Sequence, residues 1–210
     1  MHRLLKPLSP AALGLAAALA AAAAEPGDFD YWLLALSWTP SWCLAEGDPG
    51  DAQCDPQRDL GFTLHGLWPQ DEVGWPEDCD SPFADPSRRE TAAMADIMGS
   101  GGLAWYQWKK HGRCSGLAAA AYLDTARLAY TLVARPVPTA TAVTAEALEA
   151  AFLALNPDLD HDTLVVTCRD DRVQEVRVCL DRDLAPRACG ADVLRSACRQ
   201  RDPLDLPPVR

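Results

Sequence analysis

Length, composition and charge describe an acidic chain of one-domain size. The sequence has 210 residues, of which 49% are hydrophobic, and its 30 acidic and 19 basic side chains give a formal net charge of −11 at pH 7. Such a chain is long enough to bury an adequate core. The acidic balance excludes a general nucleic-acid coat protein, because those proteins need a basic face to release counterions. A polyanionic ligand must therefore meet local positive charges, or bind at low pH where carboxylates protonate.

The first 24 residues have the features of a secretory signal peptide. A short basic start precedes an apolar, alanine-rich stretch at 8–24, and three alanines end it, as at a small-residue cleavage site. A membrane anchor is the less favoured alternative, because the run is short for a span and Pro10 and Gly14 interrupt it. We therefore predict a signal peptide at 1–24 and a single domain at 25–210, in a periplasmic or secreted protein without membrane contact after cleavage.

Hydrophobic periodicity, turn residues and helix caps divide the remainder into predicted elements. In chain order these are a strand at 29–38, a loop at 39–59, a strand at 61–67, a loop at 69–86, a helix at 87–98, a glycine-rich break at 99–102, a helix at 103–111, an amphipathic helix at 117–133, a proline-broken connection at 134–141, a helix at 144–155, and strands at 163–168 and 173–180. The last two strands form a hairpin that turns at 169–172. The polar tail after Arg199 is expected to be loosely held.

Eight cysteines follow the predicted signal peptide: Cys43, Cys54, Cys79, Cys114, Cys168, Cys179, Cys189 and Cys198. An even number in an exported protein implies four disulfides formed in an oxidising compartment. Structural zinc is less favoured, because neither a CxxC nor an HxxxH pair is present. Strands at both ends with helices between them fit an α+β fold. The predicted fold is a central antiparallel sheet packed against several helices and stapled by four disulfides.

Two short strings each centre on a histidine. The string F-T-L-H-G-L-W-P at 62–69 contains His65, and the string W-K-K-H-G-R-C at 108–114 contains His111. An imidazole titrates near neutral pH, so a pair of them can accept a proton from one atom and donate one to another. Of the other two histidines, one lies in the signal peptide and His161 sits between aspartates in a predicted loop, so neither is assigned a role.

Helical spacing brings three polar side chains onto one face of the predicted helix that carries the second histidine. Gln107 is three residues from Lys110 and four from His111, so an amide, an ammonium and an imidazole lie together there. Trp105 and Trp108 are also three residues apart, and we expect them to anchor the opposite side of the helix to the core.

A histidine on a strand that faces a histidine on a helix suits the cleavage of a phosphodiester with a neighbouring hydroxyl. On the strand, Thr63 shares the face of His65. One histidine would remove the 2′-OH proton of RNA and the other would protonate the departing 5′-oxygen. Lys110 would neutralise charge that builds on the phosphorane oxygens. The product would be a 2′,3′-cyclic phosphate, and the reaction needs neither a metal nor another cofactor.

Both strings resemble the active-site segments of the ribonuclease T2 family of secreted, transferase-type ribonucleases, which includes bacterial ribonuclease I-like enzymes. The first family segment reads roughly F-T-L-H-G-L-W-P, and residues 62–69 match it throughout. The second reads roughly H-E-W-x-K-H-G-T-C, and residues 106–114 keep its Trp, Lys, His, Gly and Cys. The stretch at 36–43 is also similar to the first strand of the family. The resemblance covers the chain from about Phe29 to Cys198.

The resemblance implies a role for each of these residues. His111 would be the general base towards the 2′-OH, His65 the general acid towards the leaving oxygen, and Lys110 the group that stabilises the transition state. Trp68 and Trp75 would stack on a nucleobase. The expected partner is single-stranded RNA rather than DNA, the expected specificity for the base is low, and the chain is expected to act as a monomer. The implied disulfides are Cys43–Cys54, Cys79–Cys114, Cys168–Cys198 and Cys179–Cys189.

Two residues depart from the family pattern. Gln107 replaces the usual glutamate, and Tyr106 replaces the histidine before it; both can still hydrogen-bond a phosphate. Because a carboxylate beside His111 would raise the pKa of its imidazole, its loss predicts a slower enzyme with a shifted pH profile. The departures also support a rival hypothesis, a catalytically weak family member that binds RNA or another protein. A second rival is a disulfide-stapled envelope protein with no role in nucleic-acid chemistry.

Overall fold

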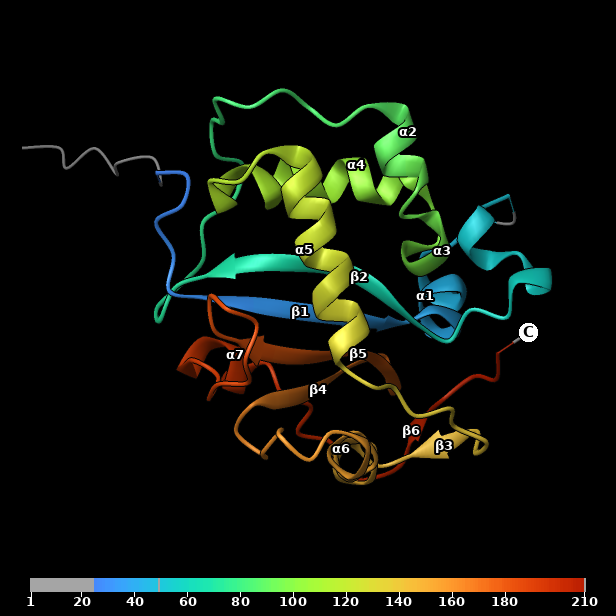
Figure 1. The fold of residues 1–210 in the computed structure, drawn as a ribbon. Helices are drawn as coiled ribbons and strands as arrows, with labels where there is room; N and C mark the ends of the chain where they lie inside the picture. Colours follow the sequence, from blue (N-terminus) through green and yellow to red (C-terminus); the bar gives the residue numbers. More distant parts are fainter. Residues whose placement is uncertain (1–24, 49, 210) are drawn as a thin grey trace, which may run out of the picture.

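The computed structural model describes residues 25–48 and 50–209, so the predicted signal peptide at 1–24 lies outside the described residues. Their elements, in chain order, are β1 (Tyr31–Trp38), α1 (Thr39–Ala45), β2 (Phe62–Gln70), α2 (Arg88–Ala92), α3 (Ala95–Met98), α4 (Gly101–Lys110), α5 (Ala119–Leu132), β3 (Ala142–Val143), α6 (Ala145–Leu155), β4 (Leu164–Arg169), β5 (Arg172–Leu180), α7 (Ala191–Arg195) and β6 (Leu204–Asp205) (Figure 1). The fold class is α+β, as predicted. None of the helices in this part of the chain is long and apolar enough to cross a membrane.

The centre of the fold is a sheet in the order β2-β1-β5-β6-β3, with β4 paired to β5 beside this path. β1 lies between β2 and β5, and all of its residues are buried. Every pair of strands is antiparallel except β5 and β6, which run parallel. The central strands β2, β1, β5 and β4 are thus antiparallel, as predicted, and the short β6 is parallel to β5 because the end of the chain returns along β5 in the same direction.

One face of the sheet is covered by helices. Side chains of β1 at alternate positions, from Trp32 to Trp38, enter the main core. Trp108 of α4, Tyr122 of α5 and Phe152 of α6 pack into the same core. Figure 1 shows α5 running across β1 and β2, and α6 next to β4. The burial of this face fixes which residues of each strand point to the other side.

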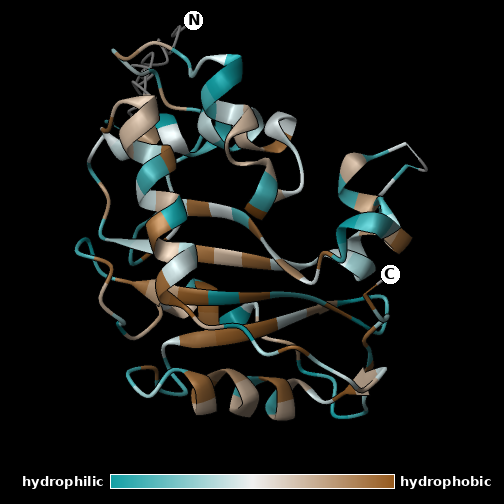
Figure 2. Cartoon of the chain, turned by 45° about the vertical axis from the view of Figure 1, so that its right-hand side comes forward, coloured by the Kyte–Doolittle hydropathy of each residue, from teal (hydrophilic) through white to brown (hydrophobic). Residues whose placement is uncertain are grey.

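The opposite face is apolar only at one end. There Tyr31 and Leu33 of β1 pack with Val193 of α7 and with the Cys179–Cys189 disulfide. Further along the strands this face carries polar side chains instead, including Ser37 and Glu175. Figure 2 shows mostly hydrophobic strands in the middle of the molecule, with hydrophilic residues in the outer loops and on the outer helices. The polar part of the face is where a site can form.

A β-bulge in β2 interrupts this pattern at a histidine. Ala35 of β1 pairs with Gly66, but the next residue, Leu36, pairs with Leu64, so His65 is an extra residue in β2. A bulge re-aims a side chain and is common beside active sites. Because of the extra residue, Leu64 and Leu67 both enter the core, although an odd number of steps separates them. The bulge thus turns His65 to the polar face without disturbing the core.

Two helical regions differ from the prediction. The segment expected to be a loop at 39–59 begins with α1, because Pro40 stands in the first turn, where its ring and missing N–H are tolerated. The helix expected at 87–98 is divided into α2 and α3. Guanidinium groups from elsewhere bind the carbonyl oxygens of Ala93 and Ala95 at this break: Arg127 at 2.6 Å and Arg58 at 2.6 Å.

The ends of three other elements are also shifted. α4 starts at Gly101 inside the predicted break, because the Ser100 hydroxyl accepts a hydrogen bond from the Leu103 N–H at 3.1 Å. β2 continues to Gln70 through Pro69, which an edge strand tolerates. The predicted β4–β5 hairpin is present and turns at Asp170 and Asp171, both with positive φ.

The tail is not loosely held. Its residues 204–205 form β6, and the side chains of Leu204 and Leu206 are buried in the main core. The Leu206 N–H donates to the Thr141 carbonyl at 2.8 Å. The prediction of a loose tail is wrong because two leucines among polar residues are enough to dock a short strand.

Four disulfides join Cys43 to Cys54, Cys79 to Cys114, Cys168 to Cys198, and Cys179 to Cys189. These are the same pairs that the family resemblance implies. Cys79–Cys114 joins the loop after β2 to the segment just past α4, so it brings together two regions that each carry site residues.

Candidate active site

His65 and His111 line one cleft of about 490 Å³ on the polar side of β2. The cleft also contains Lys110 and Gln107 from α4 and Trp68 from β2. The structure therefore brings together the side chains that the two strings predict. The two histidines come from elements that are adjacent in space, since α4 packs on β2.

The two imidazoles have different surroundings. His111 ends α4, where its N–H donates to the Gln107 carbonyl at 2.9 Å, and its side chain is buried. Burial, followed by the positive charges of Lys110 and His65, lowers the pKa of His111 to about 4. Within the described part of the chain, its Nδ1 has no hydrogen-bond partner. At neutral pH this imidazole is therefore unprotonated and able to accept a proton.

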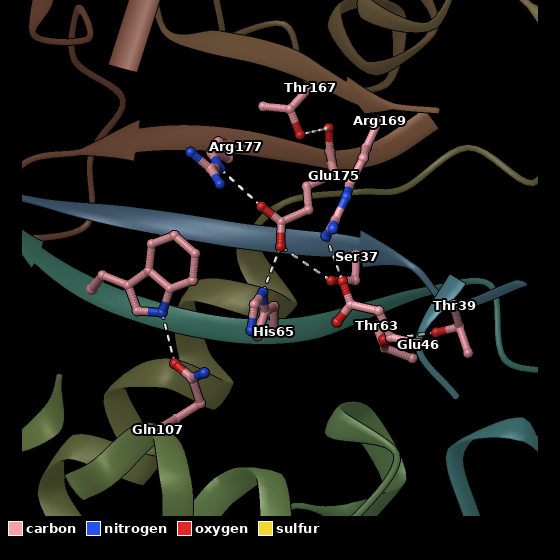
Figure 3. Close-up of polar contacts among 11 residues, drawn as sticks. Ser37, Thr39, Glu46, Thr63, His65, Gln107, Thr167, Arg169, Glu175 and Arg177 are labelled. Carbon is pink, nitrogen blue, oxygen red and sulfur yellow. Dashed lines mark hydrogen bonds and ion pairs between the residues drawn. The ribbon is translucent and has the colours of Figure 1, made fainter. Parts of the chain in front are cut away.

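His65 is instead paired with a buried carboxylate. Its Nδ1 lies 2.5 Å from Oε1 of Glu175, which belongs to β5 (Figure 3). About a third of the His65 side chain is exposed, whereas 3% of the Glu175 side chain is exposed. Burial alone would raise the pKa of Glu175, but hydrogen bonding and charge attraction to His65, with the charge of Arg177, lower that pKa to about 2. The carboxylate is therefore ionised at all but very low pH.

Trp68 lies against both imidazoles. Its ring stacks on His111 with centroids 5.1 Å apart and meets His65 edge-on with centroids 5.2 Å apart. Its indole Nε1 donates to Oε1 of Gln107 at 2.7 Å (Figure 3). Gly66 leaves the space for this contact, because a Cβ there would overlap both polar atoms. Gln107 thus fixes Trp68, which in turn contacts His111.

Lys110 is surrounded by carboxylates that the two strings do not include. Its Nζ lies 3.0 Å from Glu77 and 3.0 Å from Asp78, and hydrogen bonds to both raise the pKa of Lys110. The Asp78 N–H donates to the Lys110 carbonyl at 2.7 Å, and the neighbouring Cys79–Cys114 disulfide holds this contact. Lys110 is thus cationic and held at the cleft, and an anionic ligand there competes with two carboxylates for it.

Two exposed aromatic side chains stand at the cleft. Trp75 is 56% exposed and Tyr106 is 52% exposed, and both line the cleft with the histidines. Their position agrees with the predicted contacts to substrate. Of the two tryptophans expected to anchor α4, Trp108 is fully buried, but Trp105 is 46% exposed. The anchor prediction is therefore wrong for Trp105, because the helix lies at the edge of the core and buries a narrow stripe.

Sequence reasoning missed the charged residues of β5. Glu175 and Arg177 reach the site from a strand about 110 residues after His65 in the chain. The sequence signal is weak: a glutamate lies between Val173 and Val176 in a valine-rich strand, beside Gln174. It was not sufficient to say which side chain the glutamate would meet.

His161 does not line the cleft. His161 pairs with Glu149 at 2.8 Å, and four fifths of its side chain is exposed. In residues 25–48 and 50–209, no group of three or more His, Cys, Asp or Glu side chains is arranged to hold a metal ion.

Comparison with known proteins gives consistent matches. A sequence model of the Ribonuclease T2 family matches residues 29–189. A protein named ribonuclease from Aeromonas hydrophila is 44% identical over 93 residues, which are 44% of this chain and 41% of that protein. Ribonuclease I from Escherichia coli is 32% identical over 149 residues, which are 51% of this chain and 55% of that protein. The chain thus spans about half the length of the curated relatives that it matches.

The fold is also similar to solved structures. An RNase-related protein from Calystegia sepium superposes with a TM-score of 0.65 and 22% identity, over 87% of this chain and 98% of that chain. At this identity the likeness shows a shared fold.

Proposed function

The chain belongs to the Ribonuclease T2 family, and from this membership we propose that it is an endoribonuclease that cleaves single-stranded RNA without a metal ion. The observation that carries the proposal is the unequal pair of histidines in one cleft. His111 has a lowered pKa and is unprotonated at neutral pH, and His65 is paired with an ionised carboxylate. One is suited to accept a proton and the other to donate one.

In the proposed reaction, His111 removes the proton from a ribose 2′-OH, and the 2′-oxygen attacks the adjacent phosphorus. His65 gives a proton to the departing 5′-oxygen as the P–O bond breaks, which leaves a 2′,3′-cyclic phosphate. Lys110 stabilises the negative charge on the phosphorane. Water then opens the ring to a 3′-phosphate with the two histidines in exchanged roles.

Exposed aromatic side chains support a low base specificity. Stacking on Trp75 is sequence-tolerant, because every base has a π-face. Tyr106 is exposed beside it and can donate to a phosphate oxygen. Trp68 is the weaker candidate for stacking, because one face of its ring is taken by His111. Four disulfides support a periplasmic or secreted location for the monomeric chain, since such bonds persist in oxidising compartments.

Product analysis on an oligoribonucleotide tests the proposal. We expect 2′,3′-cyclic phosphate and then 3′-phosphate ends, undiminished activity in a metal chelator, and no cleavage of a matched 2′-deoxy oligonucleotide. Replacement His65→Ala or His111→Ala should lower kcat/KM by at least about 100-fold, the usual contribution of a general acid or base.

The alternative is a catalytically weak family member that binds RNA or a protein partner. Tyr106 and Gln107, which replace the usual histidine and glutamate, are the observations in its favour. If the purified protein forms no cyclic phosphate between pH 4 and 8, the enzyme proposal is wrong and the alternative stands. If both alanine variants keep full activity, cleavage does not depend on the two histidines and the proposed reaction is wrong.

A further inference from the structure

A polar network connects His65 to the neighbouring strands of the sheet. Glu175 is its centre, and its side chain is almost completely buried. Its Oε1 lies 2.5 Å from His65 Nδ1 and accepts a hydrogen bond from the Ser37 hydroxyl at 3.2 Å. Its Oε2 accepts a hydrogen bond from Arg177 Nε at 2.9 Å. Figure 3 shows Glu175 from β5 and His65 from β2 pointing towards each other across β1.

Small side chains on the central strand allow this contact. β1 lies between β2 and β5, so the strands that carry His65 and Glu175 are about 10 Å apart. In register, Ser37 of β1 faces Glu175 on one side and Thr63 on the other, and Ala35 faces Arg177. Larger residues at Ala35 or Ser37 would fill the path between the two side chains. The bulge then turns His65 towards that path.

We propose that Glu175 is a positioning residue for the reaction proposed above: it accepts the Nδ1–H of His65, so that Nε2 is the nitrogen that delivers the proton to the departing 5′-oxygen. The inference rests on the proposed function, because it assigns Glu175 to the general-acid half of that reaction. Glu175 acts through His65 and does not itself contact the substrate.

The chemistry of the carboxylate determines which nitrogen carries the proton. Glu175 is ionised, since its pKa is lowered to about 2, and an ionised carboxylate can only accept hydrogen bonds. The proton in the 2.5 Å contact therefore belongs to Nδ1 of His65. A carboxylate or carbonyl behind a functional histidine fixes its tautomer and ring orientation in this way. His111 has no such partner in the described chain, which separates the two histidines by role.

The test compares two substrates that differ in the leaving group. Cleavage of a dinucleotide releases an alkoxide-like 5′-oxygen that needs a proton, whereas a uridine 3′-(4-nitrophenyl phosphate) releases a phenolate that is stable without one. The amide of Glu175→Gln can either accept from or donate to the imidazole, so it no longer fixes the tautomer. We expect kcat for the dinucleotide to fall about 10- to 100-fold with KM little changed, and kcat for the aryl ester to stay within about threefold.

The chain offers a matched control in the Glu149–His161 pair, which has the same Oε1···Nδ1 contact at 2.8 Å away from the cleft. Glu149→Gln should leave both substrates unchanged. In a His65→Ala background, adding Glu175→Gln should change the dinucleotide rate by less than about threefold, because the group through which Glu175 acts is gone. An equal loss on both substrates, or a full additional loss in the His65→Ala background, would overturn the proposal.

A second measurement needs no variant. The ¹⁵N spectrum of the unaltered protein, titrated to the neutral form of His65, should show a protonated Nδ1 and an unprotonated Nε2. The opposite tautomer would contradict the inference even if Glu175→Gln does not fold. If the unaltered protein cleaves neither substrate, the proposed function fails, while the tautomer still reports on the pairing of Glu175 with His65.

Discussion

At the scale of single residues, the two histidines of the cleft are made unequal by their neighbours. His111 is buried next to a lysine, and both conditions disfavour its protonated form, so its pKa falls to about 4. His65 is a third exposed and pairs with Glu175. The residues of the strings alone do not distinguish the two histidines; the family resemblance implies different roles, and the different environments support the proposed assignment.

Gln107→Glu tests the effect of the unusual glutamine. A carboxylate here would still accept the Trp68 hydrogen bond, and its charge would raise the pKa of His111 above about 4. Since the general base works unprotonated, the acid limb of the kcat/KM profile should move to higher pH. A profile measured from pH 3 to 8 checks this shift. Gln57→Glu adds the same charge at an exposed turn and should leave the profile in place; an unchanged rate and profile in Gln107→Glu would show that the substitution has no catalytic importance.

Lys110→Ala should have two effects. Loss of the cation at the phosphorane should lower kcat/KM about 100-fold, at the low end of the range for one donor, because Lys110 is partly exposed and shared with two carboxylates. Loss of the same charge should also raise the pKa of His111 and move the acid limb to higher pH. One pH–rate profile of kcat/KM measures both the fall in rate and the shift of the acid limb.

Lys109→Ala is the matched control for this prediction. Lys109 is the adjacent residue and pairs with Asp85 at 3.6 Å instead of with the carboxylates of the cleft. We expect its removal to change kcat/KM less than about threefold. Equal losses in the two variants would mean that general positive charge on α4, and not the position of Lys110, matters for the reaction.

At the scale of elements, β2 is specialised by one bulge and one glycine. The bulge presents His65 to the polar face, and Gly66 lets Trp68 and Gln107 meet in front of the strand. The first family string contains His65 and Gly66. The string does not show that both matter through the backbone, His65 as the extra residue of the bulge and Gly66 because it has no side chain. A change that keeps every polar group can therefore still damage the site.

Gly66→Ala should lower the free energy of unfolding by about 1–3 kcal/mol, because the new methyl group would overlap Gln107 and Trp68. The folded fraction should also lose activity, since Trp68 would move from His111. Denaturant titration and kcat/KM of the folded protein measure the two effects. Gly102→Ala lies in α4 with its nearest neighbouring atom at 3.8 Å and should raise stability by up to about 1 kcal/mol. If Gly66→Ala behaves like Gly102→Ala, the close contact has no energetic weight.

Two errors of the sequence-based prediction share one cause at this scale. The break between α2 and α3 and the strand β6 both depend on partners from distant parts of the chain. Arg58 and Arg127 bind carbonyl groups at the helix break, and Leu204 docks the tail into the core. Local composition indicates a continuous helix in the first place and a loose tail in the second, because it contains no information about such partners.

At the scale of the whole molecule, the disulfides decide how the two halves of the cleft are held. Cys79–Cys114 closes the loop that carries Glu77 and Asp78 against the end of α4. The double variant Cys79→Ala, Cys114→Ala should lower the free energy of unfolding by about 2–4 kcal/mol, mainly by releasing the unfolded chain. It should also lower kcat/KM of the folded protein, because Lys110 and His111 lose their support.

Cys43→Ala with Cys54→Ala separates these two effects. The Cys43–Cys54 disulfide joins α1 to the segment that follows it. Its removal should also destabilise the protein by about a few kcal/mol, but it leaves the contacts of Lys110 intact. We expect near-normal kcat/KM below its unfolding temperature. If both double variants keep full activity when folded, the Cys79–Cys114 bond serves stability alone.

The sequence by itself determined which groups are candidates for the site, because residues 62–69 and 106–114 hold His65, Trp68, Gln107, Lys110 and His111 at fixed local spacings. It also indicated most strands and helices, since their apolar periodicity is local. Only the tertiary structure decided how those groups differ. The contact of His65 with Glu175 crosses β1 and joins residues 110 apart, and the low pKa of His111 follows from burial. Strand order and burial are properties of the packed chain, so no local pattern contains them.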